Sequence, residues 1–253
     1  MDMRIFDLTR RVAIVTGGNG GIGLGMARGL IEAGASVLIA GRDEAKNRAA
    51  TDQLGERASS SVVDLLSDGA AERLVADAVA QFGRLDILVN NAGTNIRKRP
   101  EEYTSQEWRT VLDTNLTSAF LCSQAAYPEL KRSGGGKIIN IGSMMSIFGA
   151  SFAAPYAASK GGVVQLTKAL ASAWAADLIQ VNAVLPGWID TALTQQARRD
   201  VPGLHERVLG RTPAARWGVA DDLAGVAVFL ASPASDFITG VAIPVDGGYS
   251  IQG

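Results

Sequence analysis

The sequence predicts an α/β fold in which helices cover both faces of a parallel β-sheet. Short runs rich in Val, Ile, Leu and Ala alternate with longer segments of helical pattern along all 253 residues. The short runs are apolar throughout, which is typical of strands that are buried on both faces. Repeated strand–helix units of this kind form a doubly wound sheet. No linker rich in Pro, Ser or Gly divides the chain, so residues 1–253 are expected to form one domain.

Each element is predicted from its composition and its neighbours. The expected strands are short and mostly β-branched, and they lie at residues 11–16, 36–40, 61–63, 85–90, 137–141, 179–185 and 241–245. The first expected helix follows a glycine run and the second is rich in charge; the set lies at residues 21–33, 42–54, 67–82, 104–132, 155–176 and 221–231. The weakest pattern follows the sixth strand, where residues 187–216 are polar and helical only in parts. Long excursions of this kind form lids over sites, so this segment is predicted to be a substrate lid.

The composition excludes several classes of protein. Apolar residues make up 47% and charged residues 19%, a balance that is typical of globular chains and not of disordered ones. Lys and Arg together number 24 against 25 Asp and Glu, and no long basic run is available to bind nucleic acid. The single cysteine, Cys122, excludes an intrachain disulfide and fits a reducing compartment. No apolar run approaches the ~20 residues that span a bilayer. We therefore expect a cytoplasmic protein with no membrane or nucleic-acid partner and no bound metal.

A glycine cluster, TGGNGGIG at residues 16–23, lies between the first strand and the first helix. Glycines at such a turn let the backbone approach a pyrophosphate, while the helix N-terminus offers N–H groups and partial positive charge. Two spacings fit the cluster. Gly18, Gly20 and Gly23 match G-x-G-x-x-G, and Gly17, Gly21 and Gly23 match T-G-x-x-x-G-x-G. The sequence does not decide between them, and a glycine-rich turn without a ligand is the alternative.

The end of the second strand is expected to meet the adenosine ribose of a dinucleotide. An NAD-binding chain usually has an acidic residue there, about 20 residues beyond the glycines. This chain has Gly41 followed by Arg42, whose guanidinium can pair with a 2′-phosphate. The sequence therefore predicts that NADP(H) is preferred over NAD(H). The alternative is that Arg42 only begins a helix and that Asp43 reaches the ribose.

Tyr156 and Lys160 form the chemically most informative pair. They are four residues apart in an expected helix that begins near Pro155, so the phenol and the ammonium share one face. A nearby ammonium favours phenolate and is expected to lower the pKa of the tyrosine from its usual ~10. Such a pair can protonate a carbonyl oxygen or deprotonate an alcohol. Ser143, just after the fifth strand, is expected to hold the substrate oxygen. Asn115, a poor helix former inside a long helix, is expected to bind water or backbone.

These motifs resemble the short-chain dehydrogenase/reductase family. The resemblance rests on the order and spacing of TGGNGGIG, NNAG at residues 90–93, Asn115, Ser143, and Tyr156 with Lys160, joined by Pro186-Gly187 and by Asp246-Gly247-Gly248. It implies a Rossmann-type, seven-stranded parallel sheet and usually a homotetramer. It also implies that Tyr156 is the general acid/base, that Lys160 binds the nicotinamide ribose, and that Ser143 orients the carbonyl. Asn115 is implied to hold a water in a proton relay.

The resemblance also implies a cofactor site. Its residues are drawn from the glycine turn, from the ends of four strands and from the start of the lid: Gly17, Asn19, Gly20, Gly21, Ile22, Gly23, Arg42, Asp64, Leu65, Asn91, Ala92, Gly93, Tyr156, Lys160, Pro186, Gly187, Ile189 and Thr191. Many NADP-using members carry a basic residue at the place of Gly20. Here the predicted 2′-phosphate contact rests on Arg42 alone.

Within the family, two segments resemble gluconate 5-dehydrogenases and related deoxygluconate dehydrogenases. They are Thr-Asn-Ile-Arg-Lys-Arg at residues 94–99 and Arg-Thr-Pro-Ala-Ala-Arg-Trp-Gly at residues 211–218. Arg97 is expected to grip the carboxylate of a sugar acid such as 5-ketogluconate, because its fork pairs bidentately with carboxylates. The predicted substrate residues are Arg97, Ser143, Met145, Phe148 and Trp188.

Several alternatives stay open. Residues 97–99 form a solvated loop in one of them, with Trp188 and Phe148 shaping an apolar pocket for a plain ketone. A 3-oxoacyl-carrier-protein reductase is another, although Asp177 stands where such enzymes tend to carry a basic residue. A non-catalytic NADP-binding protein is the third. It is disfavoured because all four expected catalytic residues are present.

Overall fold

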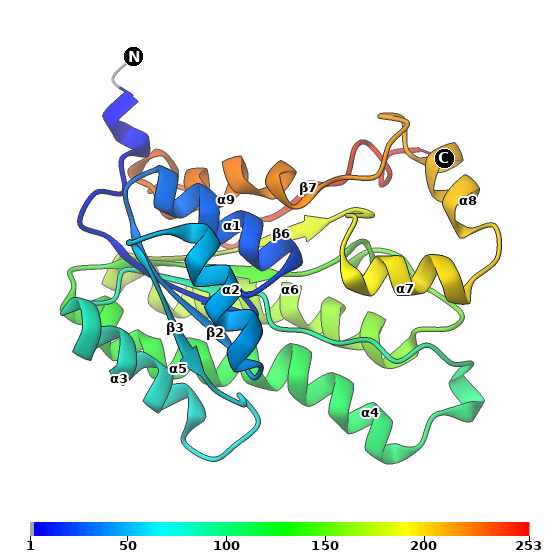
Figure 1. Cartoon of the computed structure of the whole chain (residues 1–253), viewed down its shortest axis with the longest axis horizontal. Coiled ribbons are helices and arrows are strands. Elements are labelled where there is room, and N and C mark those ends of the chain that lie inside the picture. Colours follow the sequence, from blue (N-terminus) through cyan, green and yellow to red (C-terminus); the bar gives the residue numbers. More distant parts are fainter. Residues whose placement is uncertain (1–2, 253) are drawn as a thin grey trace.

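A computed structural model describes residues 3–252, which fold around one seven-stranded parallel sheet (Figure 1). The strands are β1 Val12–Thr16, β2 Ser36–Gly41, β3 Ala58–Val62, β4 Ile87–Asn90, β5 Gly136–Ile141, β6 Ile179–Pro186 and β7 Ala242–Val245. Their order in the sheet is β3-β2-β1-β4-β5-β6-β7. The predicted α/β class, the parallel sheet and its seven strands are therefore confirmed.

The strand order reverses at β1, which pairs with β2 on one side and with β4 on the other. Connections leave β1 and β4 in opposite directions, so a crevice opens between them at the carboxyl ends of the strands. Any ligand site of this fold is therefore expected beyond Thr16 of β1 and Asn90 of β4, where the glycine turn and the Asn-Ala-Gly turn begin.

Helices cover both faces of the sheet, and each face has its own core. One face carries α1 Gly21–Glu32, α2 Glu44–Leu54 and α9 Ala224–Ala231; the other carries α3 Ala70–Phe82, α5 Ser118–Arg132 and α6 Ala154–Trp174. Successive residues of β1 serve opposite faces, because side chains alternate along a strand. Val15 packs with the first set of helices and Ile14 with the second, and both are fully buried.

The helix predicted over residues 104–132 is interrupted. It divides into α4 Ser105–Leu112, a π-helical segment Asp113–Thr117, and α5. Thr104 caps α4 by accepting a hydrogen bond from the Glu107 N–H, and the Glu107 carboxylate accepts one from the Thr104 N–H. The π segment contains the buried Asn115, and such bulges are frequent at functional sites.

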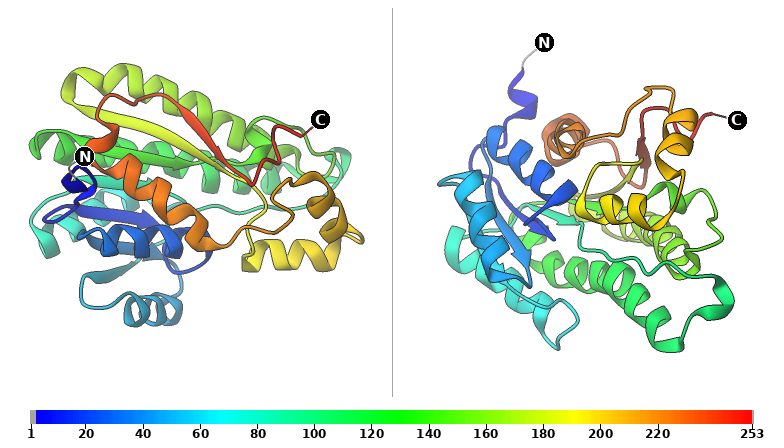
Figure 2. Two further views of the ribbon diagram at one scale, coloured as in Figure 1. Left: turned by 90° about the horizontal axis from the view of Figure 1, so that it is seen from above. Right: turned by 45° about the vertical axis from the view of Figure 1, so that its right-hand side comes forward.

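Other elements begin or end at residues that differ from the predicted ones. The strand predicted at residues 61–63 is the longer edge strand β3. Its run of serines is polar, so the apolar pattern predicted only its end. The helix predicted from residue 221 begins as a 3₁₀ turn, Ala220–Leu223, before α9. The predicted lid contains α7 Ala192–Asp200 and α8 Leu204–Arg211, which lie together at the end of the molecule opposite the N-terminus (Figures 1 and 2).

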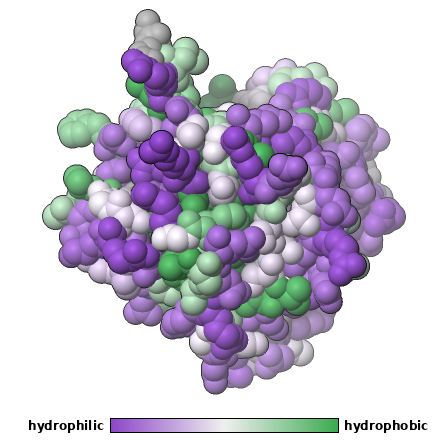
Figure 3. All heavy atoms as spheres, turned by 60° about the vertical axis from the view of Figure 1, so that its left-hand side comes forward, coloured by the Kyte–Doolittle hydropathy of each residue, from purple (hydrophilic) through white to green (hydrophobic). Residues whose placement is uncertain are grey.

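The amino end of the sheet is closed by charge pairs. Arg11 and Arg84 both donate hydrogen bonds to the buried carboxylate of Asp86, at 2.6–2.8 Å. The face on this side of the molecule is mainly hydrophilic, with small separate apolar patches (Figure 3). Among residues 3–252, no helix has the length and apolar character needed to cross a membrane.

Candidate active site

The glycine turn after β1 has two kinds of glycine. Gly17 and Gly21 have φ of 63° and 52°, in the left-handed region that disfavours other residues. Gly18 and Gly23 each leave no room for a side chain. A Cβ on Gly23 would lie 2.4 Å from the Gly17 carbonyl oxygen, and a Cβ on Gly18 would lie 2.7 Å from the Ile39 side chain. A Cβ on Gly20 would meet nothing within 4 Å. The backbone therefore depends on the spacing of Gly17, Gly21 and Gly23, with Gly18 packed beneath the turn.

Hydrogen bonds join the glycine turn after β1 to the Asn-Ala-Gly segment after β4. The Asn91 amide donates hydrogen bonds to the carbonyls of Thr16 and Gly17, both at 3.0 Å. The Thr16 hydroxyl accepts from the N–H groups of Asn91 and Ala92. No side chain caps the N-terminus of α1 at Gly20, so its N–H groups and positive dipole end are available to an anionic group. This open glycine cradle fits a dinucleotide pyrophosphate.

The end of β2 is shaped by an asparagine pair. Asn19 donates to Asn47 at 2.7 Å, and a Cβ on Gly41 would lie 2.3 Å from the Asn19 amide nitrogen. Asp43 caps α2 by accepting from the Lys46 N–H at 3.0 Å. The Arg42 side chain is exposed and makes no hydrogen bond or ion pair with the rest of residues 3–252. The Asp43 carboxylate thus caps α2, while the Arg42 guanidinium has no partner among the described residues.

Tyr156 and Lys160 lie in the first turns of α6, beside the end of β5. Pro155 lies in the first turn of this helix, which begins at Ala154. The Lys160 ammonium is buried, donates to the Ile141 carbonyl at 2.7 Å and lies 5.7 Å from the centre of the Tyr156 ring. Burial lowers the pKa of Lys160 to about 8. The ammonium is therefore anchored on β5 rather than against the phenol oxygen.

The pKa of Tyr156 differs from the expectation. Burial raises it above its usual value, and the Ser143 hydroxyl and then the positive charge of Arg97 act in the opposite direction. Lys160 is not among the groups that lower it in this structure. The expectation that the pKa of Tyr156 lies below its usual value is therefore not met, because the effect of burial exceeds those of Ser143 and Arg97.

Asn115 joins the Asn-Ala-Gly turn to α6. Its side-chain oxygen accepts from the Thr94 N–H at 2.7 Å, and its amide donates to the Thr94 carbonyl and to the Ser159 hydroxyl, each at 3.0 Å. A Cβ on Gly93 would lie 3.3 Å from the Asn115 side-chain oxygen and 3.6 Å from the Lys160 ammonium. The side chain of Asn115 therefore links the Thr94 backbone to the Ser159 hydroxyl of α6, and its role in holding a relay water stays a prediction.

A cavity of about 100 Å³ opens beside these residues. Four of the five predicted substrate residues line it, namely Arg97, Ser143, Met145 and Trp188, together with Tyr156. Phe148 does not line it, because its ring packs under the Arg211 guanidinium, 4.7 Å away, which also covers Tyr249. The other lining residues were not predicted to bind substrate, although Gly187 was predicted to bind the cofactor: Asn95, Met144, Ala150, Phe152, Ala153, Gly187, Leu193 and Thr194.

The three cations of residues 97–99 have different fates. Lys98 pairs with Glu107 at 2.5 Å and Arg99 with Glu101 at 2.7 Å. Arg97, which lines the cavity, has no hydrogen bond or ion pair within the described part of the chain. One guanidinium is thus left facing the cavity, while its neighbours are neutralised outside it.

Comparisons with known proteins agree with this geometry. A family model described as enoyl-(acyl carrier protein) reductase matches residues 17–250. The 2-dehydro-3-deoxy-D-gluconate 5-dehydrogenase of Dickeya dadantii is 43% identical over 251 residues, which are 98% of this chain and 99% of that protein. The chain belongs to the short-chain dehydrogenase/reductase family. It is therefore an NAD(P)-dependent oxidoreductase.

Two other relatives match this dehydrogenase/reductase over nearly their full length. Gluconate 5-dehydrogenase of Gluconobacter oxydans is 37% identical over 251 residues, 98% of each chain. The crystal structure of a gluconate 5-dehydrogenase from Burkholderia cenocepacia, in complex with NADP and tartrate, has a TM-score of 0.92 at 39% identity and covers 99% of both chains. The whole length of the fold is thus shared with these proteins.

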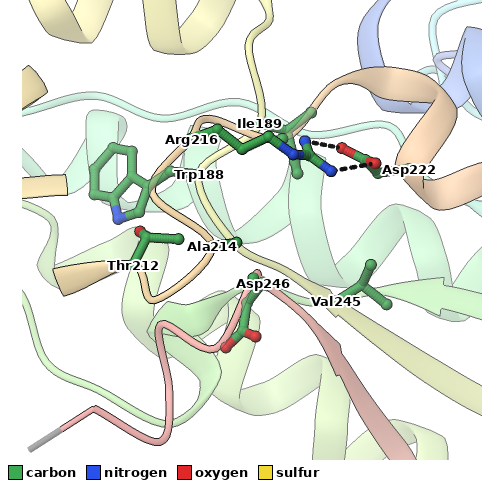
Figure 4. Close-up of a pocket in the computed structure, with 10 residues that line it drawn as sticks. Trp188, Ile189, Thr212, Ala214, Arg216, Asp222, Val245 and Asp246 are labelled. Atoms are coloured by element: carbon green, nitrogen blue, oxygen red, sulfur yellow. Dashed lines mark hydrogen bonds and ion pairs between the residues drawn. The ribbon is translucent and has the colours of Figure 1, made fainter. Parts of the chain in front are cut away.

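A second cavity of this dehydrogenase/reductase, of about 170 Å³, lies between the turn after β6 and the end of β7 (Figure 4). Trp188 and Ile189 form one wall, and Asp246 lies opposite. Its one guanidinium, that of Arg216, is bound by both oxygens of Asp222. This cavity therefore offers no free cation, in contrast to the one that contains Arg97.

Proposed function

We propose that the protein interconverts a secondary alcohol and a ketone by hydride transfer with NADP(H). The observation that carries this proposal is the position of Tyr156 and Ser143 on one cavity, with Lys160 and the open glycine turn beside it. The cofactor site is proposed to comprise the residues named from the sequence, from Gly17 to Thr191. The glycine cradle, the uncapped start of α1 and the small Gly93 support it.

In the direction of reduction, the Tyr156 hydroxyl donates a proton to the carbonyl oxygen of the substrate. Ser143 donates a hydrogen bond to the same oxygen and orients it. When bound, the nicotinamide supplies the hydride to the carbonyl carbon, or accepts it in the reverse reaction. Lys160 would bind the ribose, and its low pKa of about 8 suits a group that passes a proton toward Tyr156 through a water. Asn115 holds Thr94 and Ser159 in place near Lys160.

The proposed substrate is a gluconate-type sugar acid such as 5-ketogluconate. Arg97 supports it, because a free guanidinium on the cavity wall can pair bidentately with a carboxylate. The relatives from Dickeya dadantii and Gluconobacter oxydans, a 2-dehydro-3-deoxy-D-gluconate 5-dehydrogenase and a gluconate 5-dehydrogenase, support the same substrate class. The cofactor is proposed to be NADP(H) rather than NAD(H), since Arg42 is free and Asp43 is used as a helix cap.

The protein is also proposed to form a homotetramer, as the family usually does. Apolar side chains exposed on α4 and α5 support an interface there, namely Trp108, Phe120 and Leu121, with exposed fractions of 42%, 40% and 38%. Light scattering coupled to size exclusion tests this, and a monomeric mass at micromolar concentration would reject it.

The test of function is an absorbance assay that follows NADPH and NADH with four ketones. These are 5-ketogluconate, an uncharged keto-sugar, a simple ketone and a 3-oxoacyl thioester. We expect the highest kcat/KM with 5-ketogluconate and NADPH, and a loss of about tenfold or more in Arg97→Ala with that substrate. The matched control is Arg99→Ala, which removes the exposed cation that pairs with Glu101. Equal rates with the acid and the uncharged sugar would reject the sugar acid, and a preference for the thioester would favour a carrier-protein reductase.

A further inference from the structure

Residues 94–98 are fixed to the protein through their backbone. Asn115 bonds both the N–H and the carbonyl of Thr94. The Tyr103 hydroxyl donates to the Ile96 carbonyl at 2.6 Å and accepts from the Lys98 N–H at 3.2 Å. The Lys98 N–H also reaches the Phe152 carbonyl at 3.1 Å. The backbone of this segment is thus held on alternate residues, on both sides of Asn95 and of Arg97.

Asn95 and Arg97 have side chains that line the cavity without a protein partner. The side-chain oxygen of Asn95 is buried and accepts no hydrogen bond. Buried polar groups are nearly always satisfied, so an unsatisfied one on a cavity wall points to a partner that arrives with a ligand. The other such oxygen among the described residues belongs to Asn90, the last residue of β4, whose amide donates to Asn140 of β5 and to Ser123 of α5. Asn95 is the one that borders the candidate active site.

We infer that Asn95 is a specificity-determining residue, whose carboxamide hydrogen-bonds a hydroxyl group on the carbon chain of the substrate. A hydroxyl both donates and accepts, and a carboxamide offers both complements. Tyr156 and Ser143 bind the reacting oxygen, Arg97 binds the carboxylate, and Asn95 reads a hydroxyl near that carboxylate. This inference rests on the proposed carbonyl chemistry of the cavity and extends it from a keto acid to a polyhydroxylated keto acid.

The test compares substrates that differ only in their hydroxyl groups. One pair is 5-ketogluconate and 5-oxohexanoate, which share a carboxylate and a ketone at the same distance. A neutral pair, L-sorbose and 2-hexanone, lacks the carboxylate. Each is assayed with the wild type, with Asn95→Leu, which keeps the volume and removes the polar atoms, and with Asn95→Asp, which adds a negative charge.

We expect Asn95→Leu to lower kcat/KM about tenfold for 5-ketogluconate and to change that for 5-oxohexanoate by less than about twofold. Asn95→Asp is expected to lower kcat/KM for both acids, through repulsion of their carboxylate, and to spare L-sorbose. A loss with Asn95→Leu that is equal for hydroxylated and plain ketones, or no loss at all, overturns the inference.

Failure of the proposed substrate class gives a different result. If the wild type does not prefer acids, the sugar-acid assignment fails, and the role of Asn95 is then decided by the ratio of rates for L-sorbose and 2-hexanone. Binding is also measured without turnover, as the rise in Tm of the NADPH-bound protein on adding gluconate or hexanoate, because neither acid can accept a hydride from the reduced cofactor. The rise caused by gluconate should fall in Asn95→Leu while that caused by hexanoate is unchanged. An unchanged response to gluconate rejects the inference even if no ketone is turned over.

Discussion

The hydroxyl of Tyr103 bonds the peptide groups on both sides of Arg97. It donates to the carbonyl before this residue and accepts from the N–H after it. Tyr103 is therefore a positioning residue, which fixes the backbone from which the guanidinium of Arg97 reaches the cavity.

Tyr103→Phe should keep the ring and remove both hydrogen bonds. We expect KM for 5-ketogluconate to rise about three- to tenfold, with kcat and the KM for an uncharged ketone changed by less than about twofold. Steady-state kinetics with both substrates measures this. Tyr127→Phe is the matched control, because the Tyr127 hydroxyl bonds Asp177 far from the cavity. An equal rise in KM for both substrates would show that Tyr103 only supports the fold.

Tyr156→Phe removes the hydroxyl that is proposed to exchange a proton with the substrate oxygen. We expect kcat to fall by about a hundredfold or more, which is the usual contribution of a general acid or base. The Kd for NADPH, measured by fluorescence titration, should stay close to that of the wild type. Turnover near the wild-type rate in this variant would remove Tyr156 from the mechanism.

Arg42→Ala should weaken the binding of NADPH and not that of NADH. The guanidinium is exposed and unpaired in the described structure, so its loss removes the proposed contact with the 2′-phosphate and breaks no hydrogen bond or ion pair of the described residues. We expect KM for NADPH to rise about tenfold and KM for NADH to change by less than about twofold. Arg48→Ala, on the helix α2 that follows Arg42 and paired with Glu44, is the control. Equal small effects on both cofactors would mean that Arg42 only begins the helix.

The pH profile should depend on Arg97. Burial raises the pKa of Tyr156, while Ser143 and Arg97 lower it, so removal of Arg97 should raise this pKa further. In the oxidation of an alcohol the phenolate is the base, and the rate in Arg97→Ala should therefore rise only at higher pH than in the wild type. The profile of kcat/KM is measured with an uncharged alcohol, so that loss of carboxylate binding does not interfere. A profile that moves to lower pH, or stays in place, contradicts this role of Arg97.

Much of the fold followed from local patterns. Alternation of apolar runs with helical segments predicted the parallel sheet, because strands covered on both faces have to be apolar throughout. The predictions missed the extent of β3, whose serines suit an exposed edge, and the π segment around Asn115, whose side chain takes backbone partners at Thr94 that lie 21 residues away. Such partners are set by packing between distant segments and leave no mark in a local pattern.

By itself, the sequence determined the glycine-rich turn, the alternation of strands and helices, and the placing of Tyr156 and Lys160 on one helix face. Each of these depends on the spacing of residues over a short stretch of the chain. Tertiary structure decided which cation of residues 97–99 is free, because Lys98 and Arg99 are neutralised by Glu107 and Glu101. It also decided that the Lys160 ammonium donates to the Ile141 carbonyl, and that burial raises the pKa of Tyr156 against the effects of Ser143 and Arg97. These outcomes depend on the distances between charges and on the exclusion of water, which exist only once the strands and helices have packed.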